Sequence, residues 1–413
     1  MATERRTKTQ RVQIHLDDTP STALRVLLLS VSGELGGAEL SLAEVVAAIP
    51  PERIELHACV PHDSPLSRVL QTSGVRVHEL SLRRFRRTIH PVLMAGQLRA
   101  MHRSAREISE ICSELKIDLV HGNTNAAALL AWEVTRQSQV PHVWHCRDMM
   151  PMHGMARILG RSAVGVVAIS RAVETYLLQG RVPTSKIHRI DNGIDLRRIP
   201  EPKKWAEVRT RVRSELGIEA QRPVVLSVGA YVPWKKHEDF FAALSAIRSV
   251  VPGTVGLLAG SDQAGENAAY EELLREQARK LALGPSALKV LHQREDVPEL
   301  MCAADVLASC SENEPFGRVL AEAGAAGLPV VSTNSGAKSE IVDDHVTGLL
   351  TAPGDVGAMA SACATLLRDR ELRAEMGRAA RERVERLYDV RRTANELTML
   401  FEQLVQKSGS LEI

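Results

Sequence analysis

The stretch of residues 309–333 combines a strand end, a polar turn, a helix and a second strand within a short span. Asp305 to Ser309 form a short apolar run that closes in polar residues, as a buried parallel strand does. Pro315 disfavours helical backbone at the residue before it, so a turn is expected there. Residues 318–326 are good helix formers, and Gly327 is a typical helix stop. This order predicts a parallel α/β sheet in which a helix N-terminus, a position that stabilises anions, lies beyond the strand ends.

Two carboxylates frame this unit. Glu314 precedes the helix, and Glu322 follows inside it with seven residues between the two glutamates. The spacing alone is typical of solvated charges on a helix. With the Pro-Phe-Gly turn between them, the pattern resembles the signature of the retaining GT-B glycosyltransferases of the GT4 family (glycosyltransferase group 1). The resemblance implies that Glu314 lies beside the donor sugar and that Glu322 bonds the nucleotide ribose. It also assigns the turn and helix start to donor binding, which adds Phe316, Gly317 and Arg318.

A chain of 413 residues is too long for one ordinary core, so two domains are expected. Together with the resemblance, this predicts an α/β protein of the GT-B fold, with two Rossmann-like domains facing a central cleft. We expect a disordered leader over 1–20 and an N-terminal acceptor domain over 21–198. A C-terminal nucleotide-sugar donor domain is expected over 199–388, and a helix over 389–413 that crosses back to the first domain.

Composition narrows the classes of partner and location. The net charge of +2 provides no electrostatic footprint for nucleic acid. Six cysteines without Cys-x2-Cys spacing indicate reduced thiols in a cytoplasmic protein. The first residues lack the apolar core of a signal peptide, and no apolar run is long enough to span a bilayer. We therefore expect a cytoplasmic location, with peripheral contact at the inner membrane face left open.

The first predicted strand, residues 24–31, runs into a glycine-rich turn and then a helix, as a Rossmann-like unit begins. Gly36 and Gly37 allow backbone to approach a ligand without side-chain obstruction. The resemblance places this loop against the donor diphosphate and the acceptor.

Two further strands are predicted over residues 118–123 and 142–148, and both contain histidines. Ligands bind at the carboxyl ends of strands in such sheets, so these ends are expected to face the cleft. His145 matches the strand-end histidine that contacts the donor sugar in the family. His121 and His142 are further possible ligands.

Residues 196–221 are rich in charge and are expected to hold an isolated helix over about 203–216, so we interpret them as the linker region. After them, the second domain is expected to open with a strand over residues 222–229. The family pattern that follows is glycine, arginine, four residues and lysine, and its two cations hold the donor diphosphate. Lys235 falls on the lysine position, whereas Ala230 replaces the arginine. Lys236 or Arg318 are the candidates to compensate for the missing arginine.

Two further stretches of the second domain resemble the family. Asp296 lies in a helix start that is close to the nucleotide base in relatives. Residues 334–342 resemble the Gly-Gly-x-x-Glu-Ile-Val loop, with Ala337 in place of the second glycine.

Four arginines surround Phe85, namely Arg83, Arg84, Arg86 and Arg87. The segment is consistent with a solvated loop, and equally with a patch for an anionic acceptor or an acidic membrane surface. The helix expected over residues 91–115 carries further cations. The acceptor class, whether glycan, lipid or small molecule, stays open.

Transfer of a sugar from a nucleotide diphosphate requires a cation to stabilise the leaving diphosphate. The sequence contains no Asp-x-Asp pair, the usual metal–diphosphate bridge of the other major glycosyltransferase fold. The expectation is therefore metal-independent transfer without a cofactor, with the nucleotide-diphosphate sugar as co-substrate, and the resemblance implies that the transfer is retaining. Glu314, Lys235 and His145 are the expected catalytic residues. A non-catalytic nucleotide-sugar-binding protein and a sugar-nucleotide epimerase are the alternatives on the same fold, and a pyridoxal-dependent phosphorylase would need a much larger chain.

Overall fold

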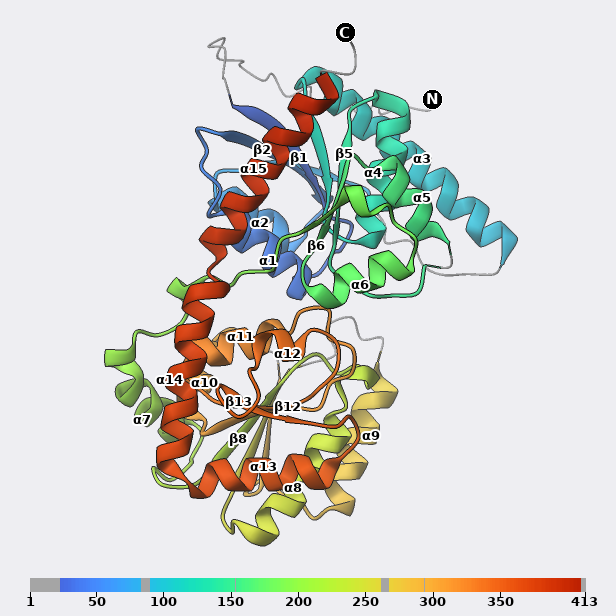
Figure 1. Ribbon diagram of the computed structural model, residues 1–413. Helices are drawn as coiled ribbons and strands as arrows, with labels where there is room; N and C mark the ends of the chain where they lie inside the picture. The colour runs from blue at the N-terminus through green and yellow to red at the C-terminus, as the bar shows by residue number, and fades with distance from the viewer. Residues whose placement is uncertain (1–22, 83–89, 153, 261–266, 293, 410–413) are drawn as a thin grey trace, which may run out of the picture.

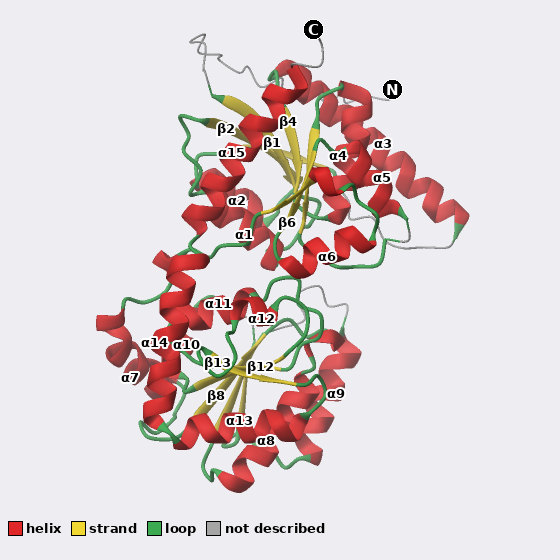
Figure 2. Cartoon of the chain, in the orientation of Figure 1, coloured by secondary structure: helices red, strands yellow, loops and turns green. Residues whose placement is uncertain are grey.

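The computed structural model describes residues 23–82, 90–152, 154–260, 267–292 and 294–409. Two α/β domains lie end to end, and the chain crosses between them twice (Figure 1). In each domain, helices cover both faces of a parallel sheet (Figure 2). The leader expected over 1–20 lies outside the described residues.

The N-terminal domain is built on a seven-stranded sheet with the order β3-β2-β1-β4-β5-β6-β7. Its elements are β1 (Leu24–Leu29), α1 (Gly37–Val46), β2 (Ile54–Pro61), α2 (Pro65–Thr72), β3 (Arg76–Leu80), α3 (Pro91–Glu114), β4 (Leu119–Gly122), α4 (Asn125–Ser138), β5 (His142–Cys146), α5 (Met155–Ser162), β6 (Gly165–Ala168), α6 (Arg171–Gln179) and β7 (Ile187–Arg189).

The C-terminal domain is built on a six-stranded sheet with the order β10-β9-β8-β11-β12-β13. Its elements are α7 (Trp205–Glu215), β8 (Val224–Val228), α8 (His237–Val250), β9 (Val255–Ala259), α9 (Ala268–Lys280), β10 (Leu288–Leu291), α10 (Val297–Ala303), β11 (Val306–Ser309), α11 (Arg318–Ala325), β12 (Val330–Thr333), α12 (Lys338–Ile341), β13 (Gly348–Thr351), α13 (Val356–Arg368) and α14 (Arg370–Leu387), and the long α15 (Val390–Gly409) follows.

Strand β1 shows why the central strands read as continuous apolar runs. Leu27 and Leu29 pack into the cluster that α3 and α4 complete, whereas Val26 and Leu28 pack into the cluster that α1 and α15 complete. Since both faces of the sheet are covered, apolar side chains point to both of them, and Val26 to Leu29 are all buried. All strand pairs in both sheets are parallel, so the carboxyl ends of neighbouring strands share one edge.

The last two helices join the domains. Helix α14 packs on α11 in the C-terminal domain, and α15 packs on α1 in the N-terminal domain. Between them, Ile194 pairs with the returning chain: its N–H donates to Tyr388 at 2.8 Å, and its carbonyl accepts from Val390 at 3.0 Å. A Cβ on Gly193 would lie 2.5 Å from the Val390 Cα, so this crossing requires glycine.

Helix α7 belongs to the C-terminal domain, which corrects the expectation of an isolated helix in a linker. It packs against α10. Its Arg213 is buried, and one of its nitrogens donates to Asp305 at 2.9 Å while others bond backbone carbonyls. The sequence of α7 resembles a linker because it is rich in charge. In the structure, however, Arg213 uses its charge in a buried ion pair inside the domain.

Candidate active site

The carboxyl ends of β8 and β11 lie side by side because β8 pairs with β11 on one side and β9 on the other. The strand order reverses between these two strands, which is where open α/β sheets bind ligands. The loops after β8 and β11 carry the residues singled out from the sequence. The comparable edge of the N-terminal sheet faces them from the other domain (Figure 1).

Lys235 and Glu314 form the centre of this site. The Nζ atom of Lys235 lies 2.6 Å from the Oε1 atom of Glu314 and 4.3 Å from the centre of the Trp234 ring. The side chain of Lys235 retains 16% of its exposure and that of Glu314 retains 10%. Burial raises the pKa of Glu314, but the charge and hydrogen bond of Lys235 outweigh it, so the net pKa is lowered. The two side chains therefore form an ionised pair with limited access to solvent.

Glycines allow the surrounding loops to close on this pair. A Cβ on Gly229 would lie 3.2 Å from the Lys235 Cδ, so the lysine stem lies directly over that glycine. A Cβ on Gly336 would lie 2.3 Å from the Glu314 carbonyl oxygen, and Gly336 has a φ of +62°. The N–H of Ala337 donates to the same oxygen at 2.9 Å. The loop that begins at residue 334 thus holds the backbone of Glu314.

Lys338 is a further cation of this site that the sequence did not single out. Its side chain is fully buried, and its Nζ donates to the Ser311 carbonyl and to the Thr333 hydroxyl. Its charge also acts on Glu314. The sequence offered no signal for Lys338, because a lysine in a loop is ordinarily exposed.

Arg318 connects the C-terminal domain to the N-terminal domain. Its Nη2 donates to Glu322 Oε1 and to Glu44 Oε1, both at 2.7 Å, and its Nη1 donates to Glu44 Oε2 at 2.9 Å. Burial lowers the pKa of Arg318, but the carboxylates of Glu322 and Glu44 raise it by more, so the net pKa is raised. In this structure Arg318 is bound to two carboxylates, and Lys236 pairs with Glu312 at 3.6 Å.

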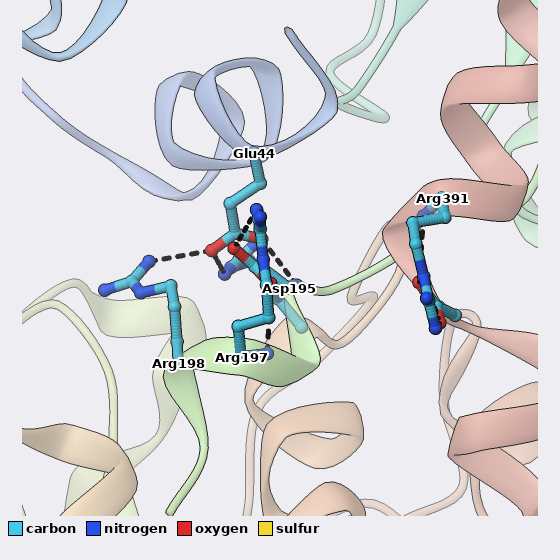
Figure 3. Close-up of polar contacts among 7 residues, drawn as sticks. Glu44, Asp195, Arg197, Arg198 and Arg391 are labelled. Carbon is cyan, nitrogen blue, oxygen red and sulfur yellow. Dashed lines mark hydrogen bonds and ion pairs between the residues drawn. The ribbon is translucent and has the colours of Figure 1, made fainter. Parts of the chain in front are cut away.

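Glu44 is a buried acceptor that sequence analysis missed. Besides Arg318, it accepts from Arg198 Nη1 at 2.7 Å and from the backbone N–H of Asp195 at 3.2 Å. Figure 3 shows Glu44 reaching down from α1 toward the chain crossing, where Arg198 points at it and Arg197 pairs with Asp195. The available signal in the sequence was a glutamate within an apolar run, since Leu42, Ala43, Val45 and Val46 surround Glu44 and all are buried on α1.

A second set of contacts joins the domains at the start of α6. The Ser170 hydroxyl donates to the Pro315 carbonyl at 2.6 Å. The Glu340 carboxylate accepts from the backbone N–H groups of Arg171 at 2.8 Å and Ala172 at 2.9 Å. A carboxylate at a helix N-terminus is favourable. On the C-terminal side, these contacts involve the same loops that hold Glu314.

On the N-terminal side, a buried arginine bonds helix α1, which the glycine loop precedes. Gly36 precedes α1 and Gly37 begins it. Arg147 donates to Asn123 at 2.7 Å and to Ser41 at 2.9 Å, and Asn123 donates in turn to the Ala38 carbonyl. Burial lowers the pKa of Arg147 to about 9. Arg147 thus ties the strand end of β5 to α1 and to the chain after β4.

His145 is fully buried beside His121, whose Nε2 lies 3.0 Å from the His145 Nδ1. Burial lowers the pKa of His121 to about 3 and that of His145 well below its usual value, so both rings are neutral. His142, by contrast, begins β5 and hydrogen-bonds Thr135 at 2.9 Å. It lies at the opposite end of the strand from the site, so its suggested role as a ligand there is wrong.

The other predicted site residues are placed as follows. Phe316 is buried and contacts the Tyr388 ring, with 5.6 Å between ring centres. Gly317 has a φ of +98° and precedes α11. Asp296 precedes α10 and accepts from Arg294 at 2.7 Å. The acceptor arginines Arg83, Arg84, Arg86 and Arg87 lie outside the described residues.

Two parallel α/β domains whose strand-end loops meet across an interface define the GT-B class, and the predicted fold is confirmed by solved structures. Anabaena HepE, solved with UDP and glucose, is 26% identical, with a TM-score of 0.78 over 92% of this chain and 99% of that chain. A Thermosynechococcus elongatus sucrose-phosphate synthase, 20% identical, has a TM-score of 0.77 over 93% of this chain and all of the other.

The chain belongs to the group 1 glycosyltransferases. Residues 208–383 match the family described as "Glycosyl transferases group 1", and residues 35–198 match "Glycosyltransferase Family 4". A GDP-mannose-dependent phosphatidylinositol monomannoside mannosyltransferase of Mycobacterium tuberculosis is 30% identical over 57% of this chain and 61% of its own length. A D-inositol 3-phosphate glycosyltransferase of Saccharomonospora viridis is 28% identical over 69% of this chain and 70% of that protein. The chain therefore matches about three fifths of the length of the mannosyltransferase relative.

In the described part of the chain, no helix has both the length and the apolarity needed to cross a membrane. Within the same residues, no three His, Cys, Asp or Glu side chains are grouped as metal ligands would be.

Proposed function

We propose that this protein transfers a sugar from a nucleotide-diphosphate donor to an acceptor hydroxyl, with retention of the anomeric configuration and without a metal ion. The observation that supports this most directly is the buried Lys235–Glu314 pair at 2.6 Å, beside the N-terminus of α11. A positive charge and helix N–H groups stabilise a departing diphosphate. A carboxylate at the same place can orient the hydroxyls of the sugar.

In the proposed reaction, Lys235 binds the diphosphate and Glu314 holds the sugar. The bond between the anomeric carbon and the diphosphate oxygen breaks, and the electron pair stays on the diphosphate. The acceptor hydroxyl bonds the anomeric carbon on the same face, and its proton passes to the leaving diphosphate. Glu322 binds the ribose, His145 and the loop of Gly36 and Gly37 complete the sugar and acceptor side, and no cofactor takes part.

A panel of nucleotides tests the donor first. HepE was solved with UDP-glucose, and the mannosyltransferase relatives are described as GDP-mannose-dependent, so UDP, GDP and their sugars form the panel. A ligand that binds only the folded state raises the melting temperature. Turnover with the stabilising donor should persist with excess EDTA, and proton NMR should show a product with the anomeric configuration of the donor. Loss of activity that magnesium restores would contradict the metal-independent assignment.

A non-catalytic nucleotide-sugar-binding protein is the second candidate, and Ala230 favours it, because an arginine is expected there in the enzymes. Slow hydrolysis of the donor by the purified protein distinguishes an enzyme from a binder. Tight donor binding without hydrolysis or transfer, across a broad acceptor panel, would support the binder instead.

We further propose that the acceptor side contacts an acidic membrane surface through the first half of α3. That half extends past the body of the domain (Figure 1), and none of residues 91–100 is buried. Val92, Leu93 and Leu98 are among its exposed apolar side chains, and exposed arginines follow on the same helix at Arg99, Arg103 and Arg106. Exposed apolar groups next to cations favour an anionic lipid surface.

Flotation with phosphatidylserine vesicles tests this contact. The wild type should float with the vesicles at low salt, and the double variant Leu93→Glu, Leu98→Glu should not. Leu273→Glu, at an exposed leucine on α9, is the matched control and should float like the wild type. Equal flotation of all three proteins would refute a role for α3.

A further inference from the structure

Lys338 begins the short helix α12, and its ammonium lies under the carboxyl ends of β11 and β12. The Nζ donates to the Ser311 carbonyl, to the Thr333 hydroxyl and, at 3.4 Å, to the Ser311 hydroxyl. The Thr333 hydroxyl also donates to the Ser311 carbonyl at 2.8 Å. Lys338 and Thr333 therefore both hold Ser311, which lies just after β11.

Ser311 carries this constraint to Glu314. Burial raises the pKa of the Glu314 carboxyl, whereas Lys235, the Ser311 side chain and the charge of Lys338 lower it. The neighbouring Ala337 holds the Glu314 carbonyl through its N–H. The start of α12 thus holds the backbone of Glu314 and acts on its carboxylate by charge.

The charges of this cluster do not balance. Lys235 and Lys338 contribute two ammonium groups, whereas Glu314 contributes one buried carboxylate. Removing a charge from water is costly unless an opposite charge compensates for it. Glu312 is the next acid in the loop, but its side chain is 46% exposed and it pairs with Lys236. The buried cluster therefore carries one uncompensated positive charge, which a bound anion would balance.

We propose that Lys338 is a positioning residue of this site: it fixes Ser311 in the loop that carries Glu314 and supplies the second positive charge that the diphosphate group of a nucleotide balances. The proposal rests on the proposed function for the identity of the anion. Lys338 would then supply the second cation that the family arginine provides, although residue 230 is alanine in this chain. This role also explains why a lysine is buried where an apolar residue would cost less.

Burial lowers the pKa of Lys338 to about 8. Glu314, Cys310 and Glu312 face it from the loop after β11 and raise this pKa, whereas Lys235 faces it from the loop after β8 and lowers it. The ammonium is charged below this value and neutral above it. Diphosphate affinity should therefore be full below about pH 7 and decline as the pH rises through 8, with a loss of about tenfold.

Calorimetry with UDP, GDP and inorganic pyrophosphate as probes, at several pH values, tests the charge. Lys338→Gln keeps a donor for Ser311 but removes the charge, so it should bind about tenfold more weakly at neutral pH and lose the decline near pH 8. Lys338→Arg keeps its charge at high pH, so it should bind at pH 9 nearly as at pH 7. Lys280→Met, at an exposed lysine on α9, is the control and should match the wild type.

A second readout does not depend on any nucleotide. The carboxyl carbon of Glu314, assigned with Glu314→Gln, can be titrated by carbon-13 NMR in the protein without ligand. Its midpoint should rise in Lys338→Gln and stay low in Lys338→Arg. If the wild type binds none of the probes, the proposed function fails, while this titration still decides whether Lys338 acts on Glu314.

Two outcomes would overturn the proposal. One is a folded Lys338→Gln protein with wild-type affinity and an unchanged Glu314 midpoint. Should neither variant fold, the wild type alone decides: probe affinity that stays flat from about pH 7 to about pH 9 would refute the charge contribution.

Discussion

The Nη2 atom of Arg318 lies 2.7 Å from the Oε1 atom of Glu44, and this ion pair joins the two domains. The same nitrogen donates to Glu322, the residue expected to bind ribose. The side chain of Glu44 is 5% exposed and that of Arg318 is 13% exposed, so the pair is shielded from water. Glu322 is thus linked through one guanidinium to the neighbouring domain.

Replacing Glu44 by Gln should loosen this interface. Arg318 and Arg198 would both lose a buried carboxylate, and breaking a buried pair on one side costs about 3 kcal/mol or more. The thermal unfolding midpoint should fall, and hydrogen exchange should rise around Asp195 and the start of α11. Glu110→Gln removes a glutamate from an exposed pair with Arg106, so its midpoint should stay within error of the wild type. Equal midpoints for the two variants would contradict a structural role for Glu44.

Replacing Lys235 by Ala should abolish most sugar transfer while the protein still folds. The change removes the cation nearest to Glu314 and leaves that carboxylate unpaired. Calorimetry should show a loss of UDP or GDP affinity of about tenfold or more. Lys203→Ala, at an exposed lysine before α7, is the control. Wild-type turnover in Lys235→Ala would remove the assignment of Lys235 to the diphosphate.

Replacing Glu322 by Gln should weaken nucleotide binding through the ribose. A carboxylate that accepts from ribose hydroxyls should make the wild type prefer UDP or GDP over the deoxyribose analogues by about tenfold. The variant should bind the ribose and deoxyribose forms with similar affinity. If it discriminates as the wild type does, the ribose contact lies elsewhere.

Acid should destabilise the protein below the usual pKa of histidine. Burial lowers the pKa of His121 to about 3, and those of His142 and His237 to about 4. The unfolded chain takes up protons near pH 6.5 that the folded chain does not, so stability falls as the pH decreases below that value. Each such group contributes up to about 1.4 kcal/mol per pH unit in that range.

Urea unfolding between about pH 7 and about pH 5 measures this loss. His237→Gln should show a shallower dependence on pH than the wild type. His345→Gln, at an exposed histidine, provides the control for the substitution itself. A free energy of unfolding that does not change over this range would contradict the buried neutral histidines.

The sequence by itself determined the α/β architecture and the local units of the site. Continuous apolar runs, glycine turns and helix stops are local signals, and they located the strand ends that carry His145, Lys235 and Glu314. The Glu-Pro-Phe-Gly turn and Glu322 lie within a single strand–turn–helix unit, so the sequence shows them together. The charge-rich segment of α7 was misread because a buried ion pair with Asp305 looks the same in sequence as a solvated surface.

Only the tertiary structure decided which distant groups meet. Lys235 and Glu314 are 79 positions apart, and they come within 2.6 Å because β8 and β11 are neighbours in a parallel sheet. Arg318 and Glu44 are 274 positions apart and meet only where the two domains touch. In the sequence Lys338 looks like an ordinary exposed lysine, and only the packing of β11 and β12 buries it. Charge pairing and burial depend on the arrangement of whole domains, and no local pattern encodes them.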